Sequence, residues 1–244
     1  MTSKSNEMSP AEKYQRAKEK AKYPQFELFS HELKFPLDDF QEKACLALEA
    51  GSGVLVAAPT GAGKTIVGEF AIHLALAKGQ KVFYTTPIKA LSNQKFAELA
   101  ARYGKDRVGL LTGDTNNNSE AENVVMTTEV LRNMIYATST TLMELGFVVM
   151  DEVHYLADRF RGAVWEEVIL HLPKDVKVVS LSATVSNAEE FGAWLAEVRG
   201  NTQVIVSEIR PVPLHQHVLF GDEFLELFET GSKQMRVNPE LLQK

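Results

Sequence analysis

Residues 54–65 read Val-Leu-Val-Ala-Ala-Pro-Thr-Gly-Ala-Gly-Lys-Thr, an apolar run that leads into a glycine-rich turn. The run predicts a buried strand, and the apolar spacing from Ile66 to Lys78 predicts a helix directly after the turn. A strand, a turn and a helix in this order are the context in which a G-x-x-x-x-G-K-[ST] motif binds phosphate. Ala58 stands where the strict motif has its first glycine. The stretch predicts a phosphate-binding loop, with a turn that binds nothing as the alternative.

The residue types of this loop suit a nucleotide that is bound with Mg²⁺. Glycines adopt backbone angles that are closed to other residues, so successive N–H groups can turn towards phosphate oxygens. The positive end of the following helix dipole adds to this attraction. Lys64 is expected to reach the β- and γ-phosphates, and the Thr65 hydroxyl is expected to hold Mg²⁺. The expected cofactor-binding residues of the loop are Thr60, Gly61, Ala62, Gly63, Lys64 and Thr65.

Strands and helices are expected to alternate along the rest of the chain. Several expected strands are apolar throughout, as in a parallel sheet with helices on both faces. The sequence therefore predicts an α/β fold with a mostly parallel sheet, whose functional loops meet at the carboxyl ends of the strands. After residue 65 the expected strands are 81–86, 108–112, 123–127, 147–150, 176–181 and 203–206, and the expected helices are 66–78, 90–103, 129–136, 164–172 and 187–198.

Asp151 and Glu152 directly follow the apolar strand 147–150. At the end of a parallel strand, their carboxylates would lie at the same edge of the sheet as the phosphate loop. Triphosphate hydrolysis needs one group that orients Mg²⁺ through its water shell and one that aligns the attacking water. We assign the metal to Asp151 and the water to Glu152, so the expected catalytic residues are Lys64, Asp151 and Glu152. For an isolated Asp-Glu pair, the alternative is an exposed turn.

Composition and charge are those of an ordinary globular protein. The 244 residues carry a net charge of −6, so the chain lacks the overall basic footprint that many nucleic-acid binders show. Any nucleic-acid contact must therefore come from local side chains and backbone N–H groups. No apolar run approaches the about 20 residues of a membrane helix, so no membrane contact is expected. The single cysteine, Cys45, excludes an internal disulfide and fits a reducing cytoplasm.

Further short motifs lie along the chain beside the expected strands and helices. They are Gln41 with Phe35 upstream, Thr86-Pro87-Ile88-Lys89-Ala90-Leu91, Thr112-Gly113-Asp114, Thr127-Thr128-Glu129-Val130-Leu131-Arg132, Asp151-Glu152-Val153-His154 and Ser182-Ala183-Thr184. Together with the phosphate loop, this series resembles the first RecA-like domain of superfamily-2 DExH-box helicases, from about Phe35 to Phe220. Ala58 is a form of the first glycine position that is common in that family. The resemblance implies a RecA-like P-loop NTPase domain that uses ATP and Mg²⁺.

The same resemblance implies a role for each motif. The amide of Gln41 would read the adenine edge, and the ring of Phe35 would stack on the base. His154, Ser182 and Thr184 would couple hydrolysis to strand separation. Contacts with the backbone of single-stranded RNA or DNA are implied for Pro87, Lys89, Gly113, Asp114, Thr127, Thr128 and Arg132.

Three further stretches carry a resemblance at the level of one branch of the superfamily. They are Leu91-Ser92-Asn93-Gln94-Lys95, Arg161-Gly162 with Trp165-Glu166-Glu167, and Arg210-Pro211-Val212-Pro213-Leu214. These stretches resemble the superkiller-type branch, which comprises the exosome-associated RNA helicases and their bacterial relatives of the actinobacterial HelY type. The branch resemblance favours RNA over DNA as the substrate.

Three segments are expected: a polar N-terminal extension over residues 1–30, an ATP-binding RecA-like domain over 31–206, and the start of a connection over 207–244. That connection would lead to a second RecA-like domain that is absent from this chain and would supply arginine fingers. The sequence thus predicts the ATP-binding domain of an ATP-dependent helicase, which hydrolyses ATP feebly by itself. The alternatives are a stand-alone nucleotide-binding or regulatory module, a DNA helicase fragment, and a small-molecule kinase.

Overall fold

The structure is a computed structural model of the chain, and it describes residues 22–159, 162–183, 187–212, 215–228 and 236–242. By its internal contacts the chain divides into two units, one that ends at Ile209 and one that begins at Arg210. This division lies three residues beyond the expected end of the RecA-like domain at residue 206. Each unit has its own secondary structure.

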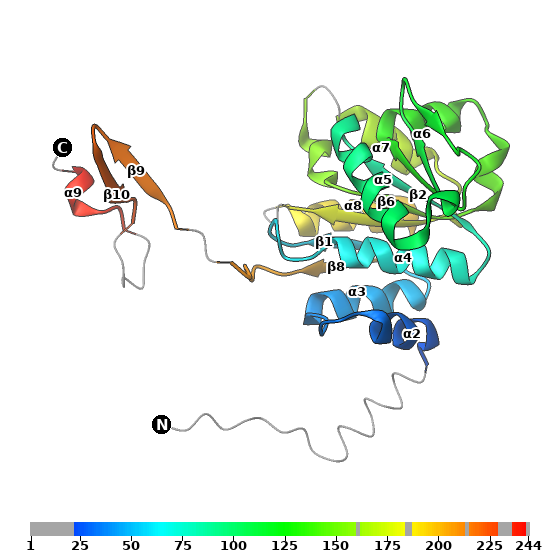
Figure 1. The fold of residues 1–244 in the computed structure, drawn as a ribbon, viewed down its shortest axis with the longest axis horizontal. Helices are drawn as coiled ribbons and strands as arrows, with labels where there is room; N and C mark the ends of the chain where they lie inside the picture. Colours follow the sequence, from blue (N-terminus) through cyan, green and yellow to red (C-terminus); the bar gives the residue numbers. More distant parts are fainter. Residues whose placement is uncertain (1–21, 160–161, 184–186, 213–214, 229–235, 243–244) are drawn as a thin grey trace, which may run out of the picture. The chain divides into compact units, whose positions relative to one another are not determined.

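The first unit is built on an eight-stranded sheet (Figure 1). The strand order is β4-β3-β5-β2-β6-β7-β1-β8, and every neighbouring pair is parallel except β3 and β4. The sheet confirms the prediction of a mostly parallel α/β fold. Its strands are β1 (Gly53–Ala57), β2 (Lys81–Thr86), β3 (Val108–Leu111), β4 (Asn116–Asn117), β5 (Asn123–Thr127), β6 (Leu145–Met150), β7 (Lys177–Ser182) and β8 (Thr202–Val206).

Helices cover both faces of this sheet. For this reason β1, β5 and β6 are buried along their whole length. One hydrophobic core lies under α2 (Pro24–Glu32), α3 (Asp39–Glu49), α4 (Thr65–Ala77) and α5 (Lys89–Tyr103). The core of the other face lies under α6 (Thr128–Tyr136), α7 (Gly162–His171) and α8 (Ala188–Arg199). Short 3-10 turns η1 (Lys105–Arg107), η2 (Thr140–Glu144) and η3 (Val153–Ala157) complete the unit. None of the helices in the described residues is long and apolar enough to cross a membrane.

Helix α2 corrects the expected polar extension over residues 1–30. From Pro24 onwards the chain is helical, and Phe26 and Phe29 are buried on one side of this helix. The Phe29 ring meets Phe70 of α4 edge to face, with 5.2 Å between the ring centroids. The Glu49 carboxylate accepts hydrogen bonds from the first N–H groups of α2, at 2.9 and 2.7 Å. The two buried phenylalanines therefore fix this segment on the first unit, while residues 1–21 lie outside the described part.

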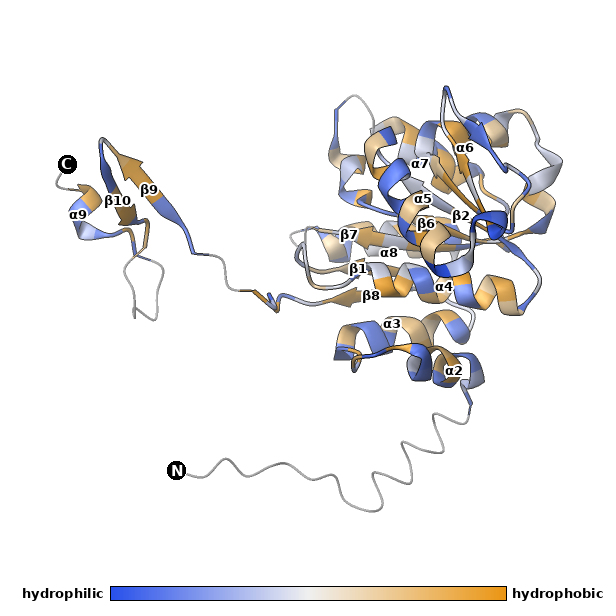
Figure 2. Cartoon of the chain, viewed as in Figure 1, coloured by the Kyte–Doolittle hydropathy of each residue, from blue (hydrophilic) through white to orange (hydrophobic). Residues whose placement is uncertain are grey.

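The second unit contains a short antiparallel hairpin of β9 (His217–Phe220) and β10 (Glu223–Glu226), followed by α9 (Pro239–Leu242). Figure 2 shows hydrophobic colouring on part of each hairpin strand, next to hydrophilic positions. Leu219 and Phe224 are largely exposed. The sequence analysis did not anticipate these strands within the expected connection 207–244.

The packing of α2 predicts a large effect of a core truncation there. Phe29→Ala should lower the free energy of unfolding by about 3–5 kcal/mol, because the ring is fully buried and a cavity would remain. Urea denaturation followed by circular dichroism measures this change. The control is Leu28→Ala on the exposed side of the same helix, which should change the value by less than about 0.5 kcal/mol. Similar small effects of both substitutions would contradict the placement of α2 in the folded unit.

Candidate functional site

The turn between β1 and α4 has the backbone geometry of a phosphate-binding loop. Gly61 and Gly63 have φ angles of 83° and 84°, in the left-handed region that favours glycine. The N–H group of Ala62 donates to the carbonyl of Pro59 and closes the turn. Among the described residues, nothing accepts a hydrogen bond from the backbone N–H groups of Gly61, Gly63 or Lys64. Free N–H groups at the start of a helix suit an anion such as phosphate.

The Lys64 side chain lies back across its own loop. Its Nζ atom donates to the carbonyls of Ala58, at 2.8 Å, and Pro59, at 3.1 Å, and the residue is 8 % exposed. Burial lowers the pKa of Lys64, whereas the negative charges of Glu152 and Asp151 act to raise that pKa. These charge interactions show that the carboxylates at the end of β6 lie close to the loop that follows β1.

The Asp151 carboxylate is held through both of its oxygens. Oδ1 accepts the N–H of Glu152 at 3.0 Å, and Oδ2 accepts the hydroxyl of Tyr84 at 2.8 Å. Tyr84 lies on β2, which pairs with β6 in the sheet. Tyr84 was not among the residues expected at the site, because a tyrosine within the apolar run of an expected strand has the pattern of an ordinary core residue. Its position one strand away from Asp151 becomes apparent only from the strand order.

Glu152 adopts a left-handed backbone conformation, with φ 54° and ψ 42°, which is rare for a residue other than glycine. Burial and the neighbouring Asp151 charge raise the pKa of the Glu152 carboxyl, while His154 and Lys64 act to lower it. Its Oε2 atom is 3.2 Å from Nδ1 of His154, but the two groups are not oriented for a hydrogen bond. A carboxyl with a raised pKa in a strained turn fits a group that exchanges protons with water.

Two of the three expected coupling residues border the same cavity. Its volume is about 510 Å³, and its walls include His154 from η3 and Ser182 from the end of β7. The carbonyl of Ser182 accepts the N–H of Ala58, so the end of β7 is bonded directly to the start of the phosphate loop. Thr184, the third expected coupling residue, lies outside the described residues.

The two residues expected at the adenine differ in their surroundings. Gln41 is buried: its Oε1 accepts the N–H of Asp38 at 2.9 Å, and its Nε2 donates to the carbonyl of Gly63 at 3.0 Å. Gln41 therefore caps the start of α3, where Asp38 is the N-cap residue, and also holds the phosphate loop. Phe35 is 51 % exposed just before this helix, so its ring is open to a stacking partner.

Lys89 and Asp114, both expected to contact nucleic acid, form an ion pair. Lys89 begins α5, and its Nζ is 2.9 Å from Oδ1 of Asp114, which also accepts the Thr112 hydroxyl. The pKa of Asp114 is lowered by its hydrogen bonds with Lys89 and Thr112. Both partners are more than half exposed. They lie beyond the ends of β2 and β3, and Gly113 lies between Thr112 and Asp114.

The remaining expected nucleic-acid residues are more enclosed. Thr127 and Thr128 are buried at the start of α6, and the Thr128 hydroxyl donates to the carbonyl of Thr86 at 3.4 Å. Arg132 lies one turn further along α6, with its Nε 3.8 Å from Oε2 of Glu167. Pro87 is buried after β2. Contacts at the two threonines would therefore involve the backbone at the helix start rather than their side chains.

A scan against protein families matches residues 38–191 to the DEAD/DEAH box helicase family. The probable helicase HelY of Mycobacterium leprae is 67% identical over 216 residues, which are 88% of this chain and 24% of that protein. The ATP-dependent RNA helicase mtr4 of Schizosaccharomyces pombe is 48% identical, over 76% of this chain and 16% of that protein. Superkiller complex protein 2 of the mouse is 47% identical, over 77% of this chain and 15% of that protein.

A search of solved structures gives the same kind of match. The structure of Mycobacterium smegmatis helicase Lhr bound to ssDNA and AMP-PNP has 28% sequence identity and a TM-score of 0.60, over 74% of this chain and 27% of that chain. The RecA-like fold and the resemblance to superkiller-type and HelY-type helicases are confirmed. The chain spans about a quarter of the length of the HelY proteins that it matches.

The phosphate-loop motif leads us to expect ATP hydrolysis. The raised pKa of Glu152 then predicts the pH at which the rate of that hydrolysis falls on the acid side, the acid limb of the pH profile. A protonated carboxyl cannot accept a proton from water, so kcat/KM should fall as pH drops through this pKa, above the usual glutamate value of about 4.3. His154→Ala should move this limb to still higher pH, because the charge interaction with His154 lowers the Glu152 pKa. Steady-state kinetics over the pH range of the intact fold measures both effects. A limb at the usual glutamate pKa would contradict the role of Glu152.

Proposed function

The chain belongs to the DEAD/DEAH box helicase family, and from this premise we propose that it is the ATP-binding domain of an ATP-dependent RNA helicase. One observation carries the proposal: β1 and β6 are both parallel neighbours of β7, so the loop with Lys64 and the pair Asp151-Glu152 follow strands that end at the same edge of the sheet. A loop lysine near two strand-end carboxylates is the arrangement that nucleoside triphosphate hydrolysis requires. The alternative of a stand-alone regulatory module is not favoured by the family match.

The residues of the loop fit ATP and Mg²⁺. The free N–H groups of Gly61 and Gly63 would hold phosphate oxygens, and Thr60 and Ala62 would complete the loop around them, with the N–H of Ala62 closing the turn. Lys64 would exchange its contacts with the loop carbonyls for the β- and γ-phosphates. Thr65 and Asp151 would hold Mg²⁺, which neutralises phosphate charge when bound, and Glu152 would accept a proton from the attacking water.

Gln41 is proposed to connect adenine recognition with the phosphate loop. Its amide already bonds to the carbonyl of Gly63, and only its Nε2 atom retains a free hydrogen for the base. A built Cβ atom at Gly63 would lie 2.6 Å from this Nε2, which explains why glycine suits that position. Phe35 would stack on the adenine from its exposed position.

His154 and Ser182 are proposed to relay the state of the nucleotide towards the nucleic acid, with Thr184 as the third member. The support is their common cavity, together with the bond from Ala58 to the carbonyl of Ser182. The proposed substrate is single-stranded RNA, bound through its backbone by Pro87, Lys89, Gly113, Asp114, Thr127, Thr128 and Arg132. RNA is favoured because mtr4, at 48% identity, is named an ATP-dependent RNA helicase.

The proposed motor needs a second RecA-like domain that supplies arginine fingers, and residues 207–244 would lead towards it. The match to HelY over 24% of that protein supports this part of the proposal. The cytoplasm is the proposed location, on the basis of the single buried cysteine Cys45.

The first test is ATP hydrolysis by this chain with and without single-stranded RNA. We expect weak turnover that RNA barely stimulates, because the proposed arginine fingers belong to a second RecA-like domain and not to the domain over residues 31–206. Lys64→Ala and Glu152→Gln should each reduce this turnover at least about 100-fold. Lys105→Ala, at an exposed lysine of η1, is the control and should retain it. Robust RNA-stimulated turnover by the unmodified chain would contradict the need for a second domain.

The second test concerns the nucleic-acid surface. Lys89→Ala should weaken binding of single-stranded RNA severalfold, because one phosphate contact is lost. For the same reason, the slope of the logarithm of the binding constant against the logarithm of the salt concentration should fall in magnitude by about one. The control is Lys81→Ala, which removes another ion-paired lysine at the start of β2, whereas Lys89 begins α5 beyond the end of that strand. Fluorescence anisotropy across a salt series measures both variants.

Equal loss of affinity in the Lys89→Ala and Lys81→Ala variants would contradict the placement of the surface at the carboxyl ends of the strands. Competition with a DNA strand of matched sequence tests the preference for RNA, since the 2′-hydroxyl is the feature that separates the two. Equal affinities would remove that preference.

A further inference from the structure

Tyr84 is a buried polar residue whose hydroxyl reaches the candidate metal site. The residue is fully buried on β2, beside Val149 of β6 in the sheet register. Its hydroxyl donates to Oδ2 of Asp151 at 2.8 Å. A phenol hydroxyl has one hydrogen to donate, and here a carboxylate oxygen accepts it inside the protein.

The ring of Tyr84 is held between two helices. On one side, Gly68 of α4 allows close approach, because a built Cβ atom at Gly68 would lie 3.1 Å from the ring carbon Cε2. On the other side, Nζ of Lys95 from α5 lies 5.5 Å from the ring centroid. Helix α4 begins at the phosphate loop, and α5 begins at Lys89. Tyr84 therefore contacts both helices as well as Asp151.

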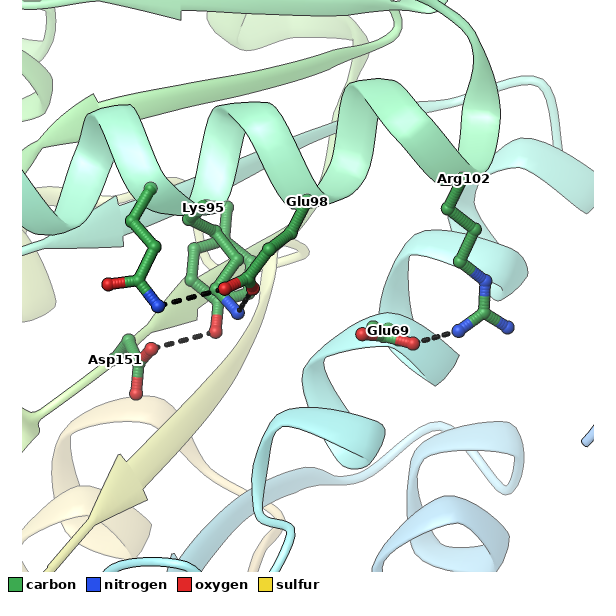
Figure 3. A network of polar contacts seen from close by, with 7 residues as sticks. Glu69, Lys95, Glu98, Arg102 and Asp151 are labelled. Carbon is green, nitrogen blue, oxygen red and sulfur yellow. Dashed lines mark hydrogen bonds and ion pairs between the residues drawn. The ribbon is translucent and has the colours of Figure 1, made fainter. Parts of the chain in front are cut away.

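Lys95 is itself fixed in place. It is on the inward side of α5, 9 % exposed, and its Nζ is 2.6 Å from Oε2 of Glu98. The other oxygen of Glu98 accepts a hydrogen bond from Gln94 at 2.9 Å. Figure 3 shows this network with Lys95, Glu98 and Asp151 labelled, and with the ion pair of Arg102 and Glu69 further along. The position of the Tyr84 ring is thus determined by groups outside the phosphate loop.

The hydrogen bond to Asp151 restricts that carboxylate in a specific way. Oδ1 is already held by the N–H of Glu152, so the bond from Tyr84 to Oδ2 fixes rotation of the whole group. A carboxylate that acts on Mg²⁺ through its water shell depends on its orientation, because the water positions follow its lone pairs. Groups that hold a metal-binding carboxylate in this way commonly change metal affinity or activity by about 10–100-fold.

We propose that Tyr84 is a positioning residue that orients Asp151 for the Mg²⁺ of bound ATP. This inference rests on the proposed function, since it requires that Asp151 acts on Mg²⁺. Without the hydroxyl, Asp151 keeps its charge but gains rotational freedom. The loss should therefore appear in Mg²⁺-dependent binding of the nucleotide and not in binding of the nucleotide by itself.

The experiment measures affinity for a fluorescent ATP analogue in the presence of EDTA and in the presence of Mg²⁺. Tyr84→Phe removes one hydroxyl and retains the ring between Gly68 and Lys95. We expect affinity in EDTA to stay within about twofold of the unmodified chain, and the gain in affinity on adding Mg²⁺ to fall about tenfold. Tyr103→Phe is the matched control, because its hydroxyl is 3.5 Å from the carbonyl of Glu69 and does not bond to Asp151. It should leave both affinities unchanged.

The combination with Asp151→Ala provides a second variant. If Tyr84 acts through Asp151, then adding Tyr84→Phe to Asp151→Ala should cause no further loss of the Mg²⁺-dependent gain. An undiminished gain in Tyr84→Phe would overturn the inference. Equal losses in EDTA and in Mg²⁺ would also overturn it, because they indicate a general packing role. If the unmodified chain shows no gain with Mg²⁺, the proposed function itself fails, independently of Tyr84.

Discussion

Parallel pairing of the strands is the constraint on which the rest of this structure depends. Since β1, β2, β3, β5, β6 and β7 run in one direction, the loops after them meet at one edge of the sheet. Residues as distant in sequence as Lys64, Asp114 and Asp151 therefore share that edge. Helices cover both faces, which leaves the ends of the strands as the place where polar groups can gather with access to solvent.

The same arrangement determines the electrostatics of the site. Asp151 and Glu152 end a strand that is buried along its whole length, and Lys64 is nearly buried beside the loop. Partial burial shifts the pKa of Lys64 downwards and that of Glu152 upwards, while the mutual attraction of their charges opposes both shifts. A lysine side chain beside the loop suits phosphate binding, and a carboxyl whose pKa is raised by burial suits proton transfer.

Much of the fold and part of the site could be predicted from the sequence. The apolar runs and the helical spacing located the strands and helices of the first unit, because burial on both faces of a sheet demands such patterns. The loop at 58–65 could be recognised since its glycines and lysine have a direct chemical reason. Helix α2 was missed, because only Phe26 and Phe29 of this nine-residue helix are buried and they continue a polar segment. The hairpin β9–β10 was missed because its short strands carry His217, Glu223 and Glu226 at their ends and so lack a continuous apolar run.

The sequence by itself determined the alternation of elements, the phosphate loop and the acidic pair at the end of a strand, because each of these depends on residues that are close along the chain. Only the tertiary structure decided which groups meet across the sheet. The bond of Gln41 to Gly63, the ion pair of Lys89 with Asp114 and the hydroxyl of Tyr84 on Asp151 all join separate elements. These contacts depend on the strand order and on how closely α4 and α5 pack on the sheet, which local residue patterns do not encode.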